Sequence, residues 1–159
     1  VLELVLIALN DLELGKDLLK SFYVVTPTSF EEMNDFVKIP AKCTWRTLIV
    51  RYGINVDMYY GNLKECVFAF KSYFPNVKVV IMGCRRNDPG CQNLCILSHT
   101  NNGWPDFLRL NPILEWTYDE VWDFILSRRI SYPILYDNGY TSIGDKLSTT
   151  KNPFLLTSD

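Results

Sequence analysis

The stretch of sequence that decides the fold is Lys78-Val79-Val80-Ile81-Met82, which runs directly into Gly83-Cys84-Arg85-Arg86-Asn87-Asp88-Pro89. Its first half is a short apolar run rich in β-branched residues, which predicts an interior strand. Its second half places polar side chains at the carboxyl end of that strand, where open α/β sheets bind their ligands. We therefore take the loop from Gly83 to Pro89 as the first candidate site, with an ordinary turn after a strand as the alternative.

Other strand-like runs alternate with helical patterns on both sides of this strand. We predict strands at 21–26 and 54–59, and helices at 1–9, 29–37, 41–52 and 63–73. A further helix is expected to start near Thr117, with Trp116 and Trp122 packed against neighbouring elements. Strands that alternate with helices build a parallel sheet with crossover helices. The sequence therefore predicts an α/β fold, with a Rossmann-like, mostly parallel sheet flanked by helices.

Length and composition exclude several classes of protein. The 159 residues, 48% of them hydrophobic, suffice for one sizeable core, so we predict a single domain over 1–159. A formal net charge of -2 gives no general attraction for nucleic acid or for an anionic membrane surface. No apolar run approaches the roughly 20 residues of a membrane-spanning helix. Five cysteines without the dense spacing of small secreted proteins favour a reducing compartment, so we expect the cytoplasm.

The loop after the predicted strand carries residue types that suit a polyphosphate and its metal ion. Gly83 lets another backbone approach closely. Arg85 and Arg86 offer planar donors that match phosphate oxygens, and Asp88 can hold a divalent cation through an oxygen. Adjacent side chains on an extended chain point in roughly opposite directions. We therefore expect Arg85 to face the ligand, and Arg86 to be solvated or paired.

A second polar cluster runs from His99 to Phe107 and contains Gly103-Trp104-Pro105. A tryptophan beside glycine and proline offers a flat, rigid face for a planar heterocycle, and Asn101 could hydrogen-bond the edge of such a ring. The alternative is that Trp104 fills the core under the loop. The residue types alone favour this alternative, because large aromatic side chains are packed more often than displayed.

The spacing of cysteine and histidine residues raises a metal-binding alternative. Cys91, Cys95 and His99 recur every four residues and would share one face of a helix, with Cys84 available as a fourth ligand. Free cysteines also pack well in cores, and a single histidine is more often a packed or solvated residue than a ligand. We therefore expect no bound zinc in this segment.

Longer motifs join the candidate residues to their neighbours. They are Val80-Ile81-Met82-Gly83-Cys84-Arg85-Arg86-Asn87-Asp88-Pro89, then Gly103-Trp104-Pro105-Asp106-Phe107-Leu108-Arg109-Leu110-Asn111-Pro112, and then Pro133 to Gly144, followed by Asn152-Pro153. With these motifs in this order, the chain resembles the eukaryotic FAD synthases of the phosphoadenylyl-sulfate reductase-like superfamily. The resemblance runs from Tyr23 to Pro153 and implies an adenine nucleotide α-hydrolase-like fold.

The resemblance implies that the phosphate of FMN attacks the α-phosphorus of ATP, with release of pyrophosphate and formation of FAD. It would make Arg85 and Asp88 the catalytic residues, with Asp88 binding Mg²⁺ directly or through water. Gly83, Arg85 and Arg109 would contact the nucleotide phosphates. FMN and ATP would be the small-molecule substrates of a protein that we expect to be a monomer and to bind neither nucleic acid nor membrane.

The same resemblance implies that the second cluster binds the flavin. Trp104 would support the flavin ring, and Asn101 stands where the family often has a flavin-binding aspartate. An asparagine oxygen still accepts one hydrogen bond but lacks the charge. The family's Ser-x-x-Gly-Gly-Lys-Asp type of pyrophosphate loop is not found before the first helix, and its basic residues after the Asn152-Pro153 pair are not found either. We therefore expect this chain to lack that N-terminal phosphate-binding loop and the C-terminal tail.

Two alternatives to an FAD synthase stay open. A sulfonucleotide reductase would share the sheet and the Tyr140 to Gly144 segment, but its chemistry needs a catalytic cysteine in a C-terminal tail, and no cysteine follows Cys95. A catalytically inactive nucleotide- or flavin-binding domain descended from the enzyme is disfavoured because Arg85, Asp88 and Trp104 are all present.

Overall fold

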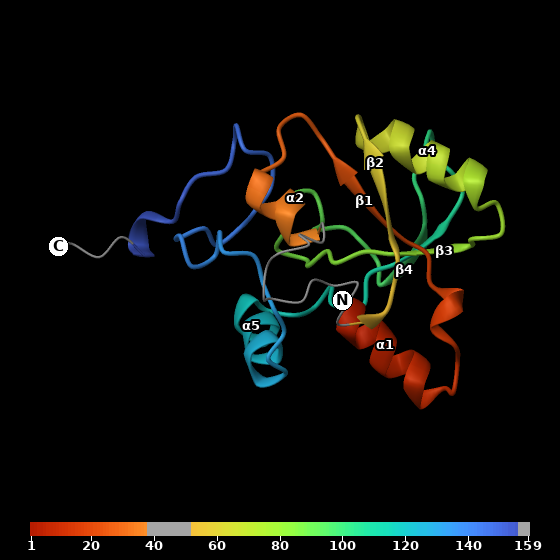
Figure 1. Cartoon of the computed structure of the whole chain (residues 1–159), viewed down its shortest axis with the longest axis horizontal. Coiled ribbons are helices and arrows are strands. Elements are labelled where there is room, and N and C mark those ends of the chain that lie inside the picture. The colour runs from red at the N-terminus through yellow and green to blue at the C-terminus, as the bar shows by residue number, and fades with distance from the viewer. Residues whose placement is uncertain (38–51, 156–159) are drawn as a thin grey trace. The chain divides into compact units, whose positions relative to one another are not determined.

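The computed structural model describes residues 1–37 and 52–155 (Figure 1). The chain divides into two compact units. Unit 1 comprises Val1–Leu19 and Asn62–Arg128, and unit 2 comprises Lys20–Gly61 and Arg129–Asp159. Every site residue predicted from the sequence lies in unit 1. The expectation of a single domain over 1–159 stays a prediction.

Two of the helices of unit 1 begin at a side chain that caps them. The helices of this unit are α1 (Leu2–Asp11), α4 (Leu63–Tyr73) and α5 (Tyr118–Ser127), together with the short 3₁₀ helix η1 (Lys16–Leu18). The side chain of Asn62 caps α4 by accepting from the Lys64 N–H at 2.8 Å. A capping box opens α5, because Thr117 accepts from the Glu120 N–H and the Glu120 carboxylate accepts from the Thr117 N–H. The helix predicted at 63–73 and the helix predicted to start near Thr117 are therefore confirmed.

The sheet of unit 1 has the strand order β3-β5-β4. Its strands are β3 (Val79–Ile81), β4 (Leu97–His99) and β5 (Leu108–Leu110), with β3 parallel and β4 antiparallel to β5. The register places Val80 and Ser98 on either side of Arg109. The loop 83–90, which we call the Arg85 loop, leaves β3 at the end of the sheet where β4 begins. The loop 100–107, which we call the Trp104 loop, joins β4 to β5 at the opposite end.

Unit 2 is built on a parallel pair of strands. The elements are β1 (Ser21–Val25), α2 (Glu31–Val37), β2 (Val56–Tyr60) and the 3₁₀ helix η2 (Pro153–Leu155). The turn after β1 also holds a later part of the chain, because the carbonyl of Thr28 accepts from the Lys146 N–H at 2.9 Å and its hydroxyl bonds Asp145. Phe30 packs edge-on against Tyr140 at 5.4 Å between ring centres. The helix predicted at 41–52 lies outside the described residues, apart from Tyr52.

The predicted α/β fold with mostly parallel strands is confirmed, with one difference. Two of the strand pairings are parallel and one is antiparallel, but the described strands form two sheets rather than one. The core of unit 1 lies beside β5, where Phe107, Asn111 and Leu114 are almost completely buried. Within 1–37 and 52–155, no helix combines the length and the apolar character needed to cross a membrane.

Candidate functional site

Asp88 closes the Arg85 loop into a turn. Its Oδ2 accepts from the Arg85 N–H at 2.8 Å, and its Oδ1 accepts from Arg85 Nη2 at 2.9 Å. The Asp88 N–H in turn donates to the Arg85 carbonyl at 3.0 Å. The Asp88 side chain is 32% exposed, so its carboxylate is fixed by the turn and still open to water. The sequence therefore produces a cation and an anion side by side, directly after the carboxyl end of β3.

Arg85 lies between Asp88 and the first residue of α5. The centre of its guanidinium group is 5.7 Å from the centre of the Tyr118 ring, a distance at which a cation and an aromatic face attract each other. The Arg85 side chain is 22% exposed. A guanidinium group has five N–H donors, and the bond to Asp88 uses one nitrogen. Arg85 can therefore hold its partner and still bind phosphate oxygens.

Arg86 is paired with Glu115. Its Nε donates to both carboxylate oxygens of Glu115, at 3.1 and 3.0 Å, and Nη2 donates to the same carboxylate. The hydrogen bonds from Arg86 lower the pKa of Glu115 below its ordinary value, so this carboxylate is ionised at neutral pH. Arg86 is therefore paired, which is one of the two states expected for it, and Arg85 also has a carboxylate partner. The expectation that Arg85 faces the ligand stays a prediction.

Gly83 and Arg109 lie at the base of the Arg85 loop. A β carbon on Gly83 would stand 3.2 Å from the side chain of Val1, so the start of α1 lies against this glycine. A role of Gly83 in phosphate binding stays a prediction. Arg109 Nε is buried and has no hydrogen-bond partner within the described residues. Burial raises the pKa of the Cys84 thiol, a hydrogen bond with Cys91 adds to the rise, and the nearby charge of Arg109 opposes it. Arg109 therefore brings a second positive charge near the loop.

The Trp104 loop is held by the hydroxyl group of Thr100. Thr100 Oγ1 donates to the Pro105 carbonyl at 2.7 Å and accepts from the Phe107 N–H at 3.2 Å. Pro105 and Phe107 are buried, whereas Asn101 and Trp104 are exposed. The alternative in which Trp104 fills the core is therefore wrong. Phe107 occupies the core position of this segment, and 38% of the Trp104 surface is exposed.

The Trp104 loop runs along helix α4. Lys71 Nζ, in the last turn of α4, is 4.6 Å from the centre of the Phe107 ring, and Lys64 Nζ, in the first turn, is 6.0 Å from the centre of the Trp104 ring. Seven helical residues span about 10 Å. The Trp104 loop therefore begins and ends at the end of the sheet opposite the Arg85 loop. Its tip extends along α4 and carries Trp104 to the first turn of that helix.

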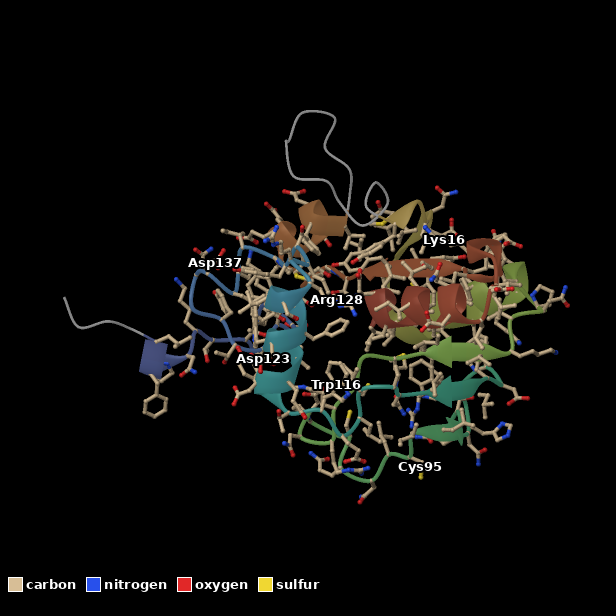
Figure 2. The ribbon with its side chains drawn as sticks, turned by 90° about the horizontal axis from the view of Figure 1, so that it is seen from below. Lys16, Cys95, Trp116, Asp123, Arg128 and Asp137 are labelled. Carbon is tan, nitrogen blue, oxygen red and sulfur yellow. The ribbon has the colours of Figure 1, made fainter. Side chains whose placement is uncertain are left out.

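The cysteines and the histidine do not share a helix face. Cys91 and Cys95 lie in irregular chain and His99 lies in β4, so the three residues do not have the helical spacing that suggested a metal site. Cys95 is exposed (Figure 2). His99 Nδ1 instead approaches Asp106 Oδ1 at 3.4 Å, with both side chains largely exposed. No group of three or more His, Cys, Asp or Glu side chains within 1–37 and 52–155 is arranged to hold a metal ion.

Several residues that build this site carry no signal in the sequence. Glu115 binds Arg86 from 29 positions further along the chain, and no local pattern links the two. Tyr118 was predicted as part of a helix start, and its ring faces Arg85 because α5 begins beside the loop. Lys64 stands beside Trp104 because the loop folds along α4. Thr100 lies inside the polar cluster 99–107 singled out in the sequence. The sequence does not show which backbone groups its hydroxyl group bonds.

Comparison with known proteins places this geometry in a family. Residues 1–151 match the family described as "Phosphoadenosine phosphosulfate reductase domain". The chain belongs to this family. Within the family, it is 35% identical over 139 residues to "Probable FAD synthase" of Schizosaccharomyces pombe, and 34% identical over 138 residues to "Probable FAD synthase" of Caenorhabditis elegans. These matches cover 87% and 86% of the chain, but 49% and 25% of the two relatives.

A solved structure of a similar protein agrees with this membership of the phosphoadenosine phosphosulfate reductase domain family. The crystal structure of Candida glabrata FMN adenylyltransferase in complex with FMN and the ATP analogue AMPCPP superposes with a TM-score of 0.76 at 26% sequence identity. The match covers 87% of this chain and 47% of that one. The chain thus spans about half the length of the fission yeast relative and of the solved structure.

Proposed function

We propose that this chain is part of an FAD synthase, which transfers the adenylyl group of ATP to FMN and releases pyrophosphate. The observation that carries the proposal is the Arg85 loop, where a guanidinium group and a carboxylate lie side by side at the carboxyl end of a parallel strand. Open α/β sheets bind nucleotides at this position. The similarity to proteins named FAD synthase over most of the chain supports the same reaction.

The nucleotide is proposed to bind at the Arg85 loop. Arg85 would contact the ATP phosphates. Arg109 Nε is buried and has no hydrogen-bond partner in the part of the chain that the structure describes, so it would supply a second donor near the base of the loop. Gly83 would let the phosphates approach the backbone there, because it has no side chain. Negative charge develops on the leaving pyrophosphate, and fixed donors that face this charge lower the barrier most effectively.

Asp88 fits the role of a Mg²⁺ ligand. Mg²⁺ usually keeps several water molecules and is held by one or two carboxylates together with substrate phosphates. Each Asp88 oxygen accepts one hydrogen bond within the turn, and a carboxylate oxygen has room for a second interaction. Mg²⁺ bound there would neutralise part of the phosphate charge. The turn would keep the Asp88 carboxylate in one orientation for the metal ion.

The flavin is proposed to bind at the Trp104 loop. The exposed face of Trp104 would support the flavin ring, and the side chain of Asn101 would hydrogen-bond its edge. The FMN phosphate is already anionic near neutral pH, so the reaction needs no nucleophile from the protein. Alignment of that phosphate with the α-phosphorus of ATP supplies much of the rate, because two bound substrates react as if within one molecule.

A direct assay tests this proposal. The full-length protein is incubated with FMN, ATP and Mg²⁺, and we expect FAD and pyrophosphate in equal amounts by chromatography. No FAD would refute the proposal. Sulfite formed from a sulfonucleotide and a thiol reductant would favour the reductase alternative. Binding of FMN and Mg-ATP in a calorimeter without any turnover would instead favour an inactive domain.

Two narrower expectations belong with this proposal. We propose that the protein is a monomer and that it acts in the cytoplasm. Light scattering after size-exclusion chromatography measures the mass of the full-length protein and tests the first expectation. Imaging of the full-length protein with a fluorescent tag tests the second.

A further inference from the structure

Every nitrogen of the Arg86 guanidinium group has an acceptor. Nε donates to both oxygens of Glu115, and Nη2 donates to the same carboxylate. Nη1 donates to the carbonyls of Gln92 at 2.9 Å and Leu94 at 3.2 Å. The planar fork of an arginine matches a carboxylate with two parallel bonds, which a lysine cannot do. One side chain therefore joins the Arg85 loop to two other segments.

The backbone of Arg86 is tied to the same turn as its side chain. Its N–H donates to the carbonyl of Leu114 at 2.7 Å, and Leu114 is 1% exposed. That turn is itself fixed, because the Leu114 N–H donates to the carbonyl of Asn111, and the Asn111 N–H donates to the carbonyl of Ile96 at the start of β4. Asn111 is fully buried. The turn from Asn111 to Glu115 is therefore a core-anchored support for the loop.

These contacts fix geometry more than they stabilise the fold. The side chains of Arg86 and Glu115 are 40% and 57% exposed, and ion pairs that water reaches contribute little to stability. Their effect is on position. Arg86 is held to Glu115 from outside the turn, and its neighbour Arg85 contacts Asp88 and Tyr118.

We propose that Arg86 and Glu115 form a clamp that positions Arg85 and Asp88 for adenylyl transfer. This inference rests on the proposed FAD synthase function and assigns a role to two residues that do not contact the substrates. A small displacement of catalytic groups lowers the reaction rate strongly, because the rate depends on their alignment. The Trp104 loop has its own anchor in Thr100. Loss of the clamp therefore slows turnover and leaves flavin binding unchanged.

The substitution Arg86→Met in the full-length protein tests the clamp. Methionine keeps much of the apolar length of the side chain and removes all of its donors. We expect kcat for FAD formation to fall at least about tenfold, with an unchanged KM for FMN and a nearly unchanged melting temperature. Arg86→Lys keeps the charge without the fork and should recover little of the rate. Arg128→Met, which removes an exposed arginine at the end of α5 (Figure 2), is the matched control and should keep the wild-type rate.

The partner residue provides a second, independent variant. Glu115→Gln removes the charge from an exposed carboxylate and changes no buried group. We expect it to lower kcat in the same direction as Arg86→Met. Because both substitutions break one contact, the double variant should be no slower than Arg86→Met alone. Losses in kcat that multiply in the double variant would overturn the clamp.

Hydrogen exchange measures the clamp without any reaction. The backbone N–H groups of Arg85, Arg86, Asp88 and Cys91 are all hydrogen-bonded. Their exchange should be faster in Arg86→Met and in Glu115→Gln, and unchanged in Arg128→Met. Wild-type exchange over 85–91 or wild-type kcat in Arg86→Met would refute the positioning role, and Glu115→Gln gives both readouts if Arg86→Met does not fold. A wild-type protein that forms no FAD would refute the proposed function, whereas faster exchange in the variants would still establish the clamp itself.

Discussion

The Arg85 loop and the Trp104 loop are held by different kinds of interaction. The first is held by two ion pairs, Arg85 with Asp88 and Arg86 with Glu115. The second is held by the neutral hydroxyl group of Thr100 and by apolar residues that reach into the core. Charged groups suit an anionic phosphate, and an exposed aromatic face suits a flat ring. The difference implies that substitutions can weaken the binding of one proposed substrate without affecting the site of the other.

The largest effect is expected from the Trp104 loop. Trp104→Ala should weaken FMN binding by about 2 kcal/mol, roughly thirtyfold, because the flavin loses one aromatic platform. Calorimetry with FMN measures the change. Turnover at saturating FMN should stay near the wild-type value, since the Arg85 loop is untouched.

An exposed aromatic residue elsewhere in the same unit provides the control. Phe68→Ala removes a ring that is 46% exposed on α4 and should leave FMN binding unchanged. Trp104→Phe keeps a smaller ring and should bind FMN with intermediate affinity. Equal FMN affinity in Trp104→Ala and the wild type would show that Trp104 is not part of the flavin site. The proposed division between a phosphate-binding loop and a flavin-binding loop would then fail.

The reverse pattern is expected from the charged loop. Asp88→Asn keeps the size of the side chain and an oxygen that can accept from the Arg85 N–H, but it removes the negative charge. FAD formation should fall by at least about tenfold, which corresponds to roughly 1.4 kcal/mol of transition-state stabilisation. FMN affinity should change little. Steady-state rates at several Mg²⁺ concentrations measure the effect.

The turn geometry sets a competing outcome for this variant. Asp88 closes the turn through its bonds to Arg85, so a purely structural role is a real alternative. In that case Asp88→Asn would melt at a lower temperature and still form FAD at a nearly normal rate per folded molecule. Asp57→Asn replaces an exposed aspartate in unit 2 and serves as the control for the loss of one negative charge.

Local signals predicted the helices of unit 1 well, and the strands less well. The helix expected at 63–73 is α4 to the residue, because a capping asparagine precedes it and Pro75 follows soon after it. The strand expected at 78–82 is β3. The strands β4 and β5 were missed, because neither contains the run of β-branched residues that marks β3, and their pairing is a long-range property.

The candidate site was predictable in its residue types and not in its contacts. Arg85 and Asp88 were expected in one loop, and they form one turn. The choice of which aromatic residue of the Trp104 loop is packed depends on tertiary structure, because Trp104 and Phe107 are both large and lie only three positions apart. The partner of Arg86 was equally hidden, because Glu115 comes next to it only after the chain has passed through β4 and β5.

A smaller effect, on stability, is expected when the hydroxyl group of Thr100 is removed. Thr100→Val keeps the shape of the side chain and deletes the hydroxyl group that bonds Pro105 and Phe107. The Phe107 N–H would then lack its partner next to a buried ring, which should cost about 1 kcal/mol of stability. Thermal melting measures the loss, and Thr100→Ser, which keeps the hydroxyl group, should lose much less. A melting temperature for Thr100→Val equal to that of the wild type would show that the apolar contacts hold the loop by themselves.

The smallest expected effect is a pH-dependent change in melting temperature. It distinguishes the Arg86–Glu115 ion pair of the Arg85 loop from the Thr100 hydroxyl group of the Trp104 loop. Hydrogen bonds from Arg86 lower the pKa of Glu115 below its ordinary value of 4.5. A carboxyl group with a lowered pKa in the folded state stabilises the fold above its ordinary pKa, and this contribution is lost as the pH falls toward the folded value. The melting temperature of Glu115→Gln should therefore lie slightly below that of the wild type near neutral pH, and the gap should close in acid.

Melting curves of the wild type, Glu115→Gln and Thr100→Val between about pH 7 and pH 3 test this difference, because exposed carboxylates titrate in that range. Glu120 and Asp145 also have lowered pKa values, but they are present in all three proteins and their contributions cancel. The deficit of Thr100→Val should stay constant, since a hydroxyl group does not titrate there. A constant deficit in Glu115→Gln as well would mean that the carboxylate holds the Arg85 loop by its shape and not by its charge, and the contrast between the two loops would then lose its electrostatic basis.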